Sequence, residues 1–196
     1  MANTNAPFGF RQYSGTGSAP TYEQVSMLIA STDTTAIYYG DPVVPLNTGY
    51  VAKGDPSGSP TVQVAGIFVG CKYTSVSQKR TVWSNYWPGS DNNGDIEAYI
   101  INDPNAKFLV QAGSAVNVTQ ADVGASISLA GGSSGNTANG ISGMYVTGPG
   151  TSSTAPFRVA GLVTEPAGTN GTDAASNANY VIVSFLNVST KTLVTI

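Results

Sequence analysis

Short strand-like runs recur along most of this chain, and each is followed by a cluster of turn-forming residues. From residue 23 onward the runs are spaced by roughly ten residues, which is typical of a β-sandwich or barrel and not of alternating strands and helices. β-Branched residues are abundant, whereas Leu, Glu and Arg, which favour helices, are scarce. We therefore expect an all-β fold: a β-sandwich or jelly-roll-like barrel with an extended N-terminal arm.

Most of the expected strands are short. In the longest apolar run, 62–73, the alternation changes parity near Gly66, which predicts a β-bulge at that glycine. In 180–188 both faces are largely apolar, so we expect a strand that is covered on both sides or completed by a neighbouring subunit. The remaining predicted strands are 25–30, 36–40, 43–46, 81–87, 96–102, 107–111, 116–119, 126–130, 141–147, 157–164 and 191–196.

Residues 1–22 differ from the rest of the chain. They contain several Gly and Pro residues and show neither helical nor strand periodicity, so we expect an extended arm, followed by a single β domain over 23–196. Phe8, Phe10 and Tyr13 are aromatic residues on this otherwise polar arm. They suggest that the arm docks against its own body, a sister subunit or another protein.

Three polar segments are longer than most loops of compact domains: 131–140, 148–156 and 165–177. Loops of this length often carry function, which makes these segments candidates for surfaces that touch a partner. The alternative is that they are solvated loops without a partner.

The low charge of the chain limits its partners. Charged residues make up 10% of the sequence and the net charge is -3, with eight basic residues scattered along the chain. This pattern lacks the cluster of basic residues that binding to nucleic acid requires, so we expect no nucleic-acid partner.

The N-terminus lacks the features of a secretory signal and no apolar stretch matches a bilayer span, so we expect no membrane partner and a location in the cytosol of the producing cell. Abundant Gly, Ser, Thr and Asn suggest a surface covered by other proteins.

The sequence contains no His, which removes the commonest general base and nearly every zinc site. We therefore expect no enzymatic activity and no cofactor. The acidic residues Asp91, Asp95, Glu97 and Asp103 leave open a glycosidase with a carboxylate pair. Because they lie in and around a turn-rich stretch, we favour roles in capping turns.

The same stretch superficially resembles a calcium site, since Asp91, Asn93 and Asp95 alternate as oxygen donors. An EF-hand loop would need Gly and a carboxylate where this chain has Ile96 and Asn102. A calcium site of another type stays an alternative, but we expect a plain solvated turn and no metal.

An aromatic group, Trp83, Tyr86 and Trp87, has two interpretations. Exposed rings beside polar loops would form a platform for sugars, whereas rings on a strand fill a core or an interface equally well, and we favour the latter.

Cys71 is the single cysteine, so an intrachain disulfide is excluded. Its apolar strand pattern predicts a buried, unreactive thiol.

Several segments, in order along the first 125 residues, are similar to a family of tailed-phage structural proteins that includes head cement proteins. They are 5–11, 37–43, 66–73, 83–88 and 98–108. The resemblance thins beyond Gly124.

This resemblance implies a capsid decoration protein that binds the outer surface of the shell formed by the phage major capsid protein. It also implies a homo-dimer or homo-trimer, located on the virion and assembled in the host cytoplasm. Phe8, Phe10 and Arg11, in the matched N-terminal segment, are the expected capsid-binding residues of the arm. The alternative function is a host-recognition or carbohydrate-binding module displayed on the virion.

Overall fold

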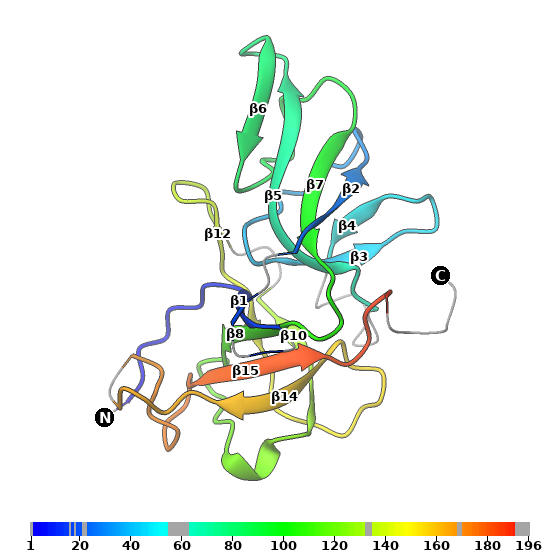
Figure 1. The fold of residues 1–196 in the computed structure, drawn as a ribbon. Helices are drawn as coiled ribbons and strands as arrows, with labels where there is room; N and C mark the ends of the chain where they lie inside the picture. The colour runs from blue at the N-terminus through cyan, green and yellow to red at the C-terminus, as the bar shows by residue number, and fades with distance from the viewer. Residues whose placement is uncertain are drawn as a thin grey trace.

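The computed structural model describes residues 2–15, 17, 19–20, 23–54, 63–131, 135–167 and 170–190, and strands dominate it (Figure 1). Two large sheets carry the fold, and the pairings between their strands are antiparallel. The prediction of an all-β chain is confirmed, and these sheets are consistent with a β-sandwich. Among the described residues no helix is long and apolar enough to cross a membrane.

The upper sheet of Figure 1 has the strand order β2-β7-β5-β3-β4, and β6 pairs with β5 outside this path. The end strands β2 and β4 contact each other, so the sheet curls. The curl encloses a core in which Trp87 is the largest fully buried side chain. The strands are β2 (Val25–Ile29), β3 (Pro42–Pro45), β4 (Val51–Lys53), β5 (Gly66–Ser75), β6 (Arg80–Ser84) and β7 (Ile96–Ile101).

The lower sheet has the order β1-β8-β15-β14-β9. Its core contains Phe10, Phe108, Phe157 and Phe185, with ring centroids 4.6 to 5.6 Å apart between neighbours. The short pair β10–β13 lies beside β8 and helps to enclose this core. The strands are β1 (Arg11–Ser14), β8 (Lys107–Gln111), β9 (Ser126–Ile127), β10 (Leu129–Ala130), β13 (Tyr145–Val146), β14 (Phe157–Leu162) and β15 (Tyr180–Phe185).

Strand β5 contributes to both cores. Ile67 packs in the lower core and Phe68 in the upper core, which explains why both faces of this strand are apolar. The register with β7 shifts between Phe68 and Gly70, so the bulge predicted at Gly66 occurs a few residues later. Gly66 instead allows the backbones of β5 and β7 to approach each other closely, because a Cβ at this position would clash with the carbonyl oxygen of Ile101.

Other predicted strands also need correction. The run 116–119 is not a strand, because the Asn179 side chain satisfies both the N–H (3.1 Å) and the C=O (2.7 Å) of Val118 in place of a neighbouring strand. The run 36–40 forms only isolated bridges, and the run 191–196 lies outside the described residues. Within the predicted arm, β1 pairs with β8.

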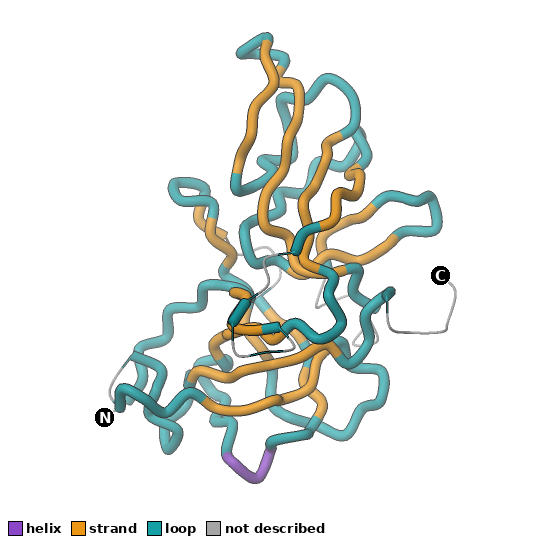
Figure 2. The backbone as a smooth tube through the Cα atoms, in the orientation of Figure 1, coloured by secondary structure: helices purple, strands orange, loops and turns teal. Residues whose placement is uncertain are grey.

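The buried Asp41 carboxylate forms an ion pair within the upper lobe, built on the upper sheet, and a hydrogen bond to the lower lobe, built on the lower sheet. The Asp41 carboxylate pairs with the Lys53 ammonium group (3.0 Å) and accepts hydrogen bonds from the Tyr38 N–H (2.8 Å) and the Ser142 hydroxyl (2.5 Å). Ser142 belongs to the hairpin of β11 (Gly135–Asn136) and β12 (Ile141–Ser142), which rises from the lower lobe (Figure 2). Burial raises the pKa of Asp41, while Lys53 acts in the opposite direction.

Candidate functional site

One face of the lower sheet is turned away from the core and carries basic side chains. Phe108 and Val110 face the core, so Lys107, on the same strand, points outward. Strand pairing places Ser184 beside Lys107 and Arg158 beside Ser184, in one row across β8, β15 and β14. With strands about 4.8 Å apart, the Lys107 and Arg158 backbones are separated by about 10 Å.

Arg11 extends this face onto the edge strand β1, where it pairs with outward-facing Leu109 and is exposed. Three of the eight basic residues of the chain therefore lie on this one surface, which we call the basic face: Arg11, Lys107 and Arg158. The strands of the lower sheet contain no Asp or Glu. The basic face is thus locally positive, although the net charge of the chain is -3.

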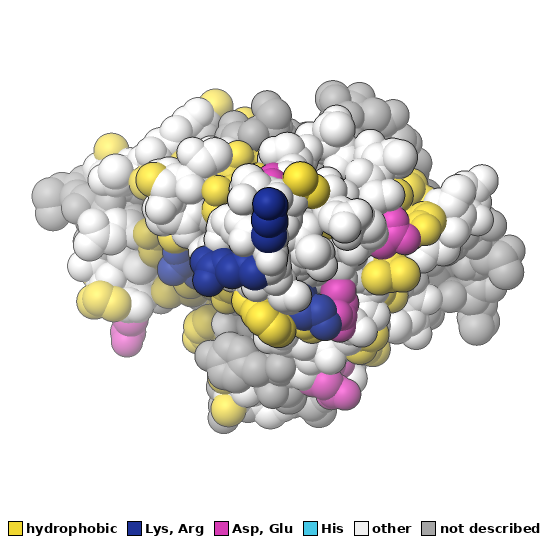
Figure 3. Space-filling view, turned by 90° about the horizontal axis from the view of Figure 1, so that it is seen from above, with side chains coloured by type: hydrophobic (Ala, Val, Ile, Leu, Met, Phe, Trp, Pro, Cys, Tyr) yellow, Lys and Arg dark blue, Asp and Glu magenta, His cyan; other side chains and the backbone are white. Residues whose placement is uncertain are grey.

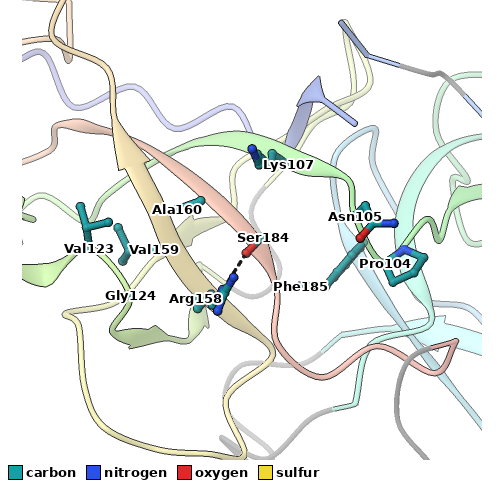
Figure 4. A pocket seen from close by; sticks show the side chains of 10 residues that line it. All are labelled: Pro104, Asn105, Lys107, Val123, Gly124, Arg158, Val159, Ala160, Ser184 and Phe185. Carbon is teal, nitrogen blue, oxygen red and sulfur yellow. Dashed lines mark hydrogen bonds between the residues drawn. The ribbon is translucent and has the colours of Figure 1, made fainter. Parts of the chain in front are cut away.

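A hollow of about 390 Å³ opens on the basic face (Figure 4). Its lining includes Lys107, Arg158 and Ser184 from the sheet, and Asn105 and Gly124 from neighbouring loops. The Nε of Arg158 donates a hydrogen bond to the Ser184 hydroxyl (3.3 Å). Its terminal guanidinium nitrogens have no hydrogen-bond partner among the described residues, so they are available to an external acceptor.

Two acidic residues lie close in sequence to this lining, and turn hydrogen bonds hold both. The Asp103 carboxylate accepts from the Asn105 N–H (2.8 Å), and the Asp122 carboxylate accepts from the N–H and hydroxyl of Thr119 (2.7 Å each). The Thr119 N–H bond is the main reason that the pKa of Asp122 is lowered. In the described ranges, neither carboxylate forms an ion pair with Lys107 or Arg158.

The arm residues predicted to bind a capsid lie beside this face. Phe10 is in the core, 1% exposed and stacked on Phe157. Phe8 is half-buried, with its ring edge-on to Tyr180 at 5.4 Å. The Arg11 guanidinium lies 4.9 Å from the Phe8 ring centroid and is exposed. In this arrangement Arg11 is accessible to a partner, whereas Phe10 supports the fold; capsid contact by these residues stays a prediction.

The start of the arm is fixed to the body by polar contacts. The Asn3 amide donates to three backbone carbonyls of the loop 170–177 (2.8 to 3.3 Å) and accepts from two backbone N–H groups there (3.1 Å each). Buried Gln111 accepts from the Ala6 N–H (2.9 Å) and donates to the Thr4 carbonyl (2.8 Å). Of the three docking possibilities, the structure shows the arm against its own body.

The acidic stretch serves to cap turns. The Asp91 carboxylate accepts from the Ser75 hydroxyl (2.5 Å) and the Ser77 N–H (2.7 Å), and these bonds lower its pKa. Asp95 accepts from the Ser31 N–H (2.9 Å), the main cause of its own lowered pKa. Within the described ranges, no group of three or more Asp, Glu or Cys residues could hold a metal ion. The interpretation as turn caps fits Asp91, Asp95 and Asp103, whereas it is wrong for Glu97, which lies within β7 and pairs with Lys72.

The aromatic group is divided between the core and the surface. Trp87 is fully buried and packs edge-on against Tyr73, with centroids 5.2 Å apart. Trp83 is 69% exposed, and Tyr86 stacks on Tyr38. A sugar platform made of both tryptophans is thus excluded, because only Trp83 is accessible.

Cys71 is buried in the upper core, as predicted. Burial raises the pKa of its thiol to about 12, so the reactive thiolate is scarce at neutral pH. Its Sγ lies 3.4 Å from the Tyr86 carbonyl oxygen. The thiol is a packing group of the core.

Sequence reasoning missed Lys107 and Arg158. Each alternates with buried residues along its strand, which signals that both point outward. The sequence does not reveal that β15 brings their strands together, so basic residues that are scattered in sequence gather in space.

Comparison with known proteins gave no relatives. No protein-family model matches the chain, and neither the curated proteins nor the solved structures contain a match. The fold and the basic face define an all-β protein with an open, positively charged sheet surface beside a docked N-terminal arm.

Proposed function

We propose that this chain is a decoration (cement) protein of a tailed-phage head, a non-enzymatic protein that binds the outside of the major capsid shell. The basic face carries this proposal. Arg11, Lys107 and Arg158 have no ion-pair partner among the described residues, whereas Lys53 and Lys72 are paired with carboxylates. Unpaired cations on an open sheet face complement a partner surface that presents carboxylates.

The chemistry of the hollow suits such a partner. An Arg guanidinium can bind a carboxylate through two parallel hydrogen bonds, and the free terminal nitrogens of Arg158 lie at the hollow. Lys107 adds a second positive charge on the same row. One acidic side chain of the shell would therefore be held between these two cations.

The stabilising mechanism is mass action. A ligand that binds only the expanded, assembled shell favours that state over every other state. Association of the protein into a homo-dimer or homo-trimer raises its effective concentration at the shell, so a modest contact per copy suffices. The sequence resemblance to phage head proteins and the low content of charged residues in the chain support the same function and a location on the virion.

Cosedimentation with expanded, undecorated capsids tests this proposal. We expect saturable binding that weakens as salt is raised, because screening acts on exposed charges. Lys107→Glu with Arg158→Glu should weaken binding at least tenfold. Lys79→Glu, at the exposed tip of the β5–β6 hairpin, is a charge-reversal control on the other lobe and should bind as the unaltered protein does.

Each failure has its own meaning. No binding of the unaltered protein would refute the decoration function. Full binding by the doubly reversed protein would agree with the decoration function. It would also show that the basic face does not contribute to binding.

A virion-displayed carbohydrate-binding module is the second candidate, because Trp83 is 69% exposed and lies opposite Lys72 on the neighbouring strand. Sugars stack on exposed aromatic rings through their apolar faces. Titration with glycans of the host surface, followed by tryptophan fluorescence, would detect such binding, and Trp83→Ala should abolish it. Unchanged fluorescence with every glycan would refute this candidate.

A further inference from the structure

Strand β6 is an open edge of the upper sheet. It pairs with β5 alone and stands outside the path in which β2 and β4 contact each other. In Figures 1 and 2, no described segment lies along the side of β6 that faces away from β5. Alternate residues of such a strand direct their backbone N–H and C=O groups outward, where they can pair with another strand.

This edge has few of the features by which proteins usually protect edges, and its one charged side chain, Arg80, stands at the first residue of the strand. Its sequence, Arg80–Ser84, contains no Pro, and its register with β5 runs without a bulge. The ends of the two large sheets have such features: β1 is bulged, β9 has two residues, and β2 and the short β4 contact each other. A weakly protected edge beside better protected sheet ends indicates a strand-pairing site.

The outer face of the sheet beside this edge is also open. Cross-strand pairing aligns Leu28, Glu97, Lys72 and Trp83 in one row. Lys72 and Glu97 form an ion pair, which leaves Trp83 (69% exposed) and Leu28 (47% exposed) as the apolar ends of the row. Trp83, at the edge, would become covered if the row continued into another strand.

The best occupant of this edge is β6 of a second copy, in antiparallel orientation. A two-fold axis at Val82 pairs Arg80 with Ser84 of the other copy, and Thr81 with Trp83 of the other copy. No like charges then lie opposite each other. Lys and Arg side chains gather on the top of the molecule, where the β5–β6 hairpin ends (Figure 3). The antiparallel arrangement directs the two basic hairpin tips away from each other, whereas a parallel one would bring them together.

We propose that this protein forms a two-fold homo-dimer in which β6 pairs with β6 and the two upper sheets become continuous. The inference names the surface behind the self-association proposed above, and it is independent of capsid binding because the interface lies on the other lobe. An edge contact of a few residues is small, so the dimer should dissociate at roughly micromolar concentration. Two linked basic faces would then engage one shell together.

Sedimentation velocity of the purified protein over a concentration series tests the proposal without any capsid. We expect a reversible shift from the 20.0 kDa monomer to a dimer. Trp83→Ser and Thr81→Lys should each weaken dimerisation at least tenfold. Val76→Ser removes a 57% exposed apolar side chain from the same hairpin but outside the strand, and it should dimerise normally.

The register is tested by oxidative cross-linking. Val82→Cys should give a covalent dimer, because directly opposed Cβ atoms of an antiparallel pair lie about 4.5–5.5 Å apart. Val76→Cys should not, and the buried thiol of Cys71 should not contribute. A monomer at every concentration, a dimer unaffected by Trp83→Ser and Thr81→Lys, or equal cross-linking at Val76 and Val82 would each overturn the proposal.

Discussion

Asp41 shows how a single buried charge ties the two lobes together. Its side chain is fully buried and Lys53 is 7% exposed, so water does not replace a lost partner. Removing one member of a buried ion pair leaves the other charge uncompensated. The Ser142 hydroxyl joins this pair from the hairpin of the lower lobe.

Replacement of Asp41 should therefore be costly. We expect Asp41→Ala to lower the free energy of unfolding by about 3–5 kcal/mol, as measured by urea denaturation. Glu23→Ala removes an exposed carboxylate and should change it by less than about 0.5 kcal/mol. A loss of less than about 1 kcal/mol for Asp41→Ala would show that the lobes do not depend on this contact.

The turn carboxylates predict the response to acid. Hydrogen bonds, first that of the Ser75 hydroxyl, hold the pKa of Asp91 below its ordinary value of 3.8, so the unfolded chain binds this proton more tightly than the folded one. The resulting stability is complete above the ordinary pKa and is lost as pH falls through the folded pKa. The pKa values of Asp95, Asp122 and Asp173 are lowered in the same way. Burial raises the pKa of Asp41, which acts in the opposite direction.

Urea midpoints below about pH 4 measure this effect. Asp91→Asn should reduce the slope of stability against pH on the acid side, because one of the contributing carboxylates is gone. An unchanged slope would show that the Asp91 hydrogen bonds contribute nothing to folding.

At the scale of elements, the N-terminal arm is an integral part of the lower sheet. It contributes β1, the buried Phe10 and the polar contacts of Asn3. Asn3→Ala removes the hydrogen bonds to the loop 170–177, so the arm should open more often. We expect hydrogen exchange at the Ala6 amide to become at least about tenfold faster, equivalent to about 1.4 kcal/mol.

Asn5 offers a matched control for this experiment, since it is the same residue type, is exposed and lies two positions after Asn3. Asn5→Ala should leave exchange at Ala6 unchanged. Equal acceleration by both substitutions would contradict a specific role for Asn3.

Strands in which apolar and polar residues alternate clearly were predictable from the sequence. The strand over 107–111 is found at its predicted bounds, because Phe108 and Val110 face a core while their neighbours face outward. The bulge in β5 was misplaced because the parity change reflects packing into two cores, which only the assembled lobes define. β1 was missed because its strand character depends on pairing with β8.

The candidate site was less accessible to sequence reasoning than the fold. Arg11 was selected through a family resemblance, whereas Lys107 and Arg158 become neighbours only through the strand order of the lower sheet. The exposure of Trp83 and the burial of Trp87 likewise depend on how the upper sheet curls.

On the scale of the whole molecule, two surfaces lie on different lobes. The basic face belongs to the lower sheet and the open β6 edge to the upper one. Under the two proposals above, one copy contacts the capsid shell through one lobe and a second copy through the other. Such a division suits a protein whose many weak contacts together stabilise a large assembly.

Cryo-electron microscopy of expanded capsids saturated with the protein would show whether it decorates the shell and which surface it uses. We expect density on the outer surface of the shell, with the lower lobe against it and Arg11, Lys107 and Arg158 facing acidic side chains of the capsid protein. Bare capsids at saturating protein would contradict the decoration function. Bound density with the basic face turned to solvent would contradict the docking surface.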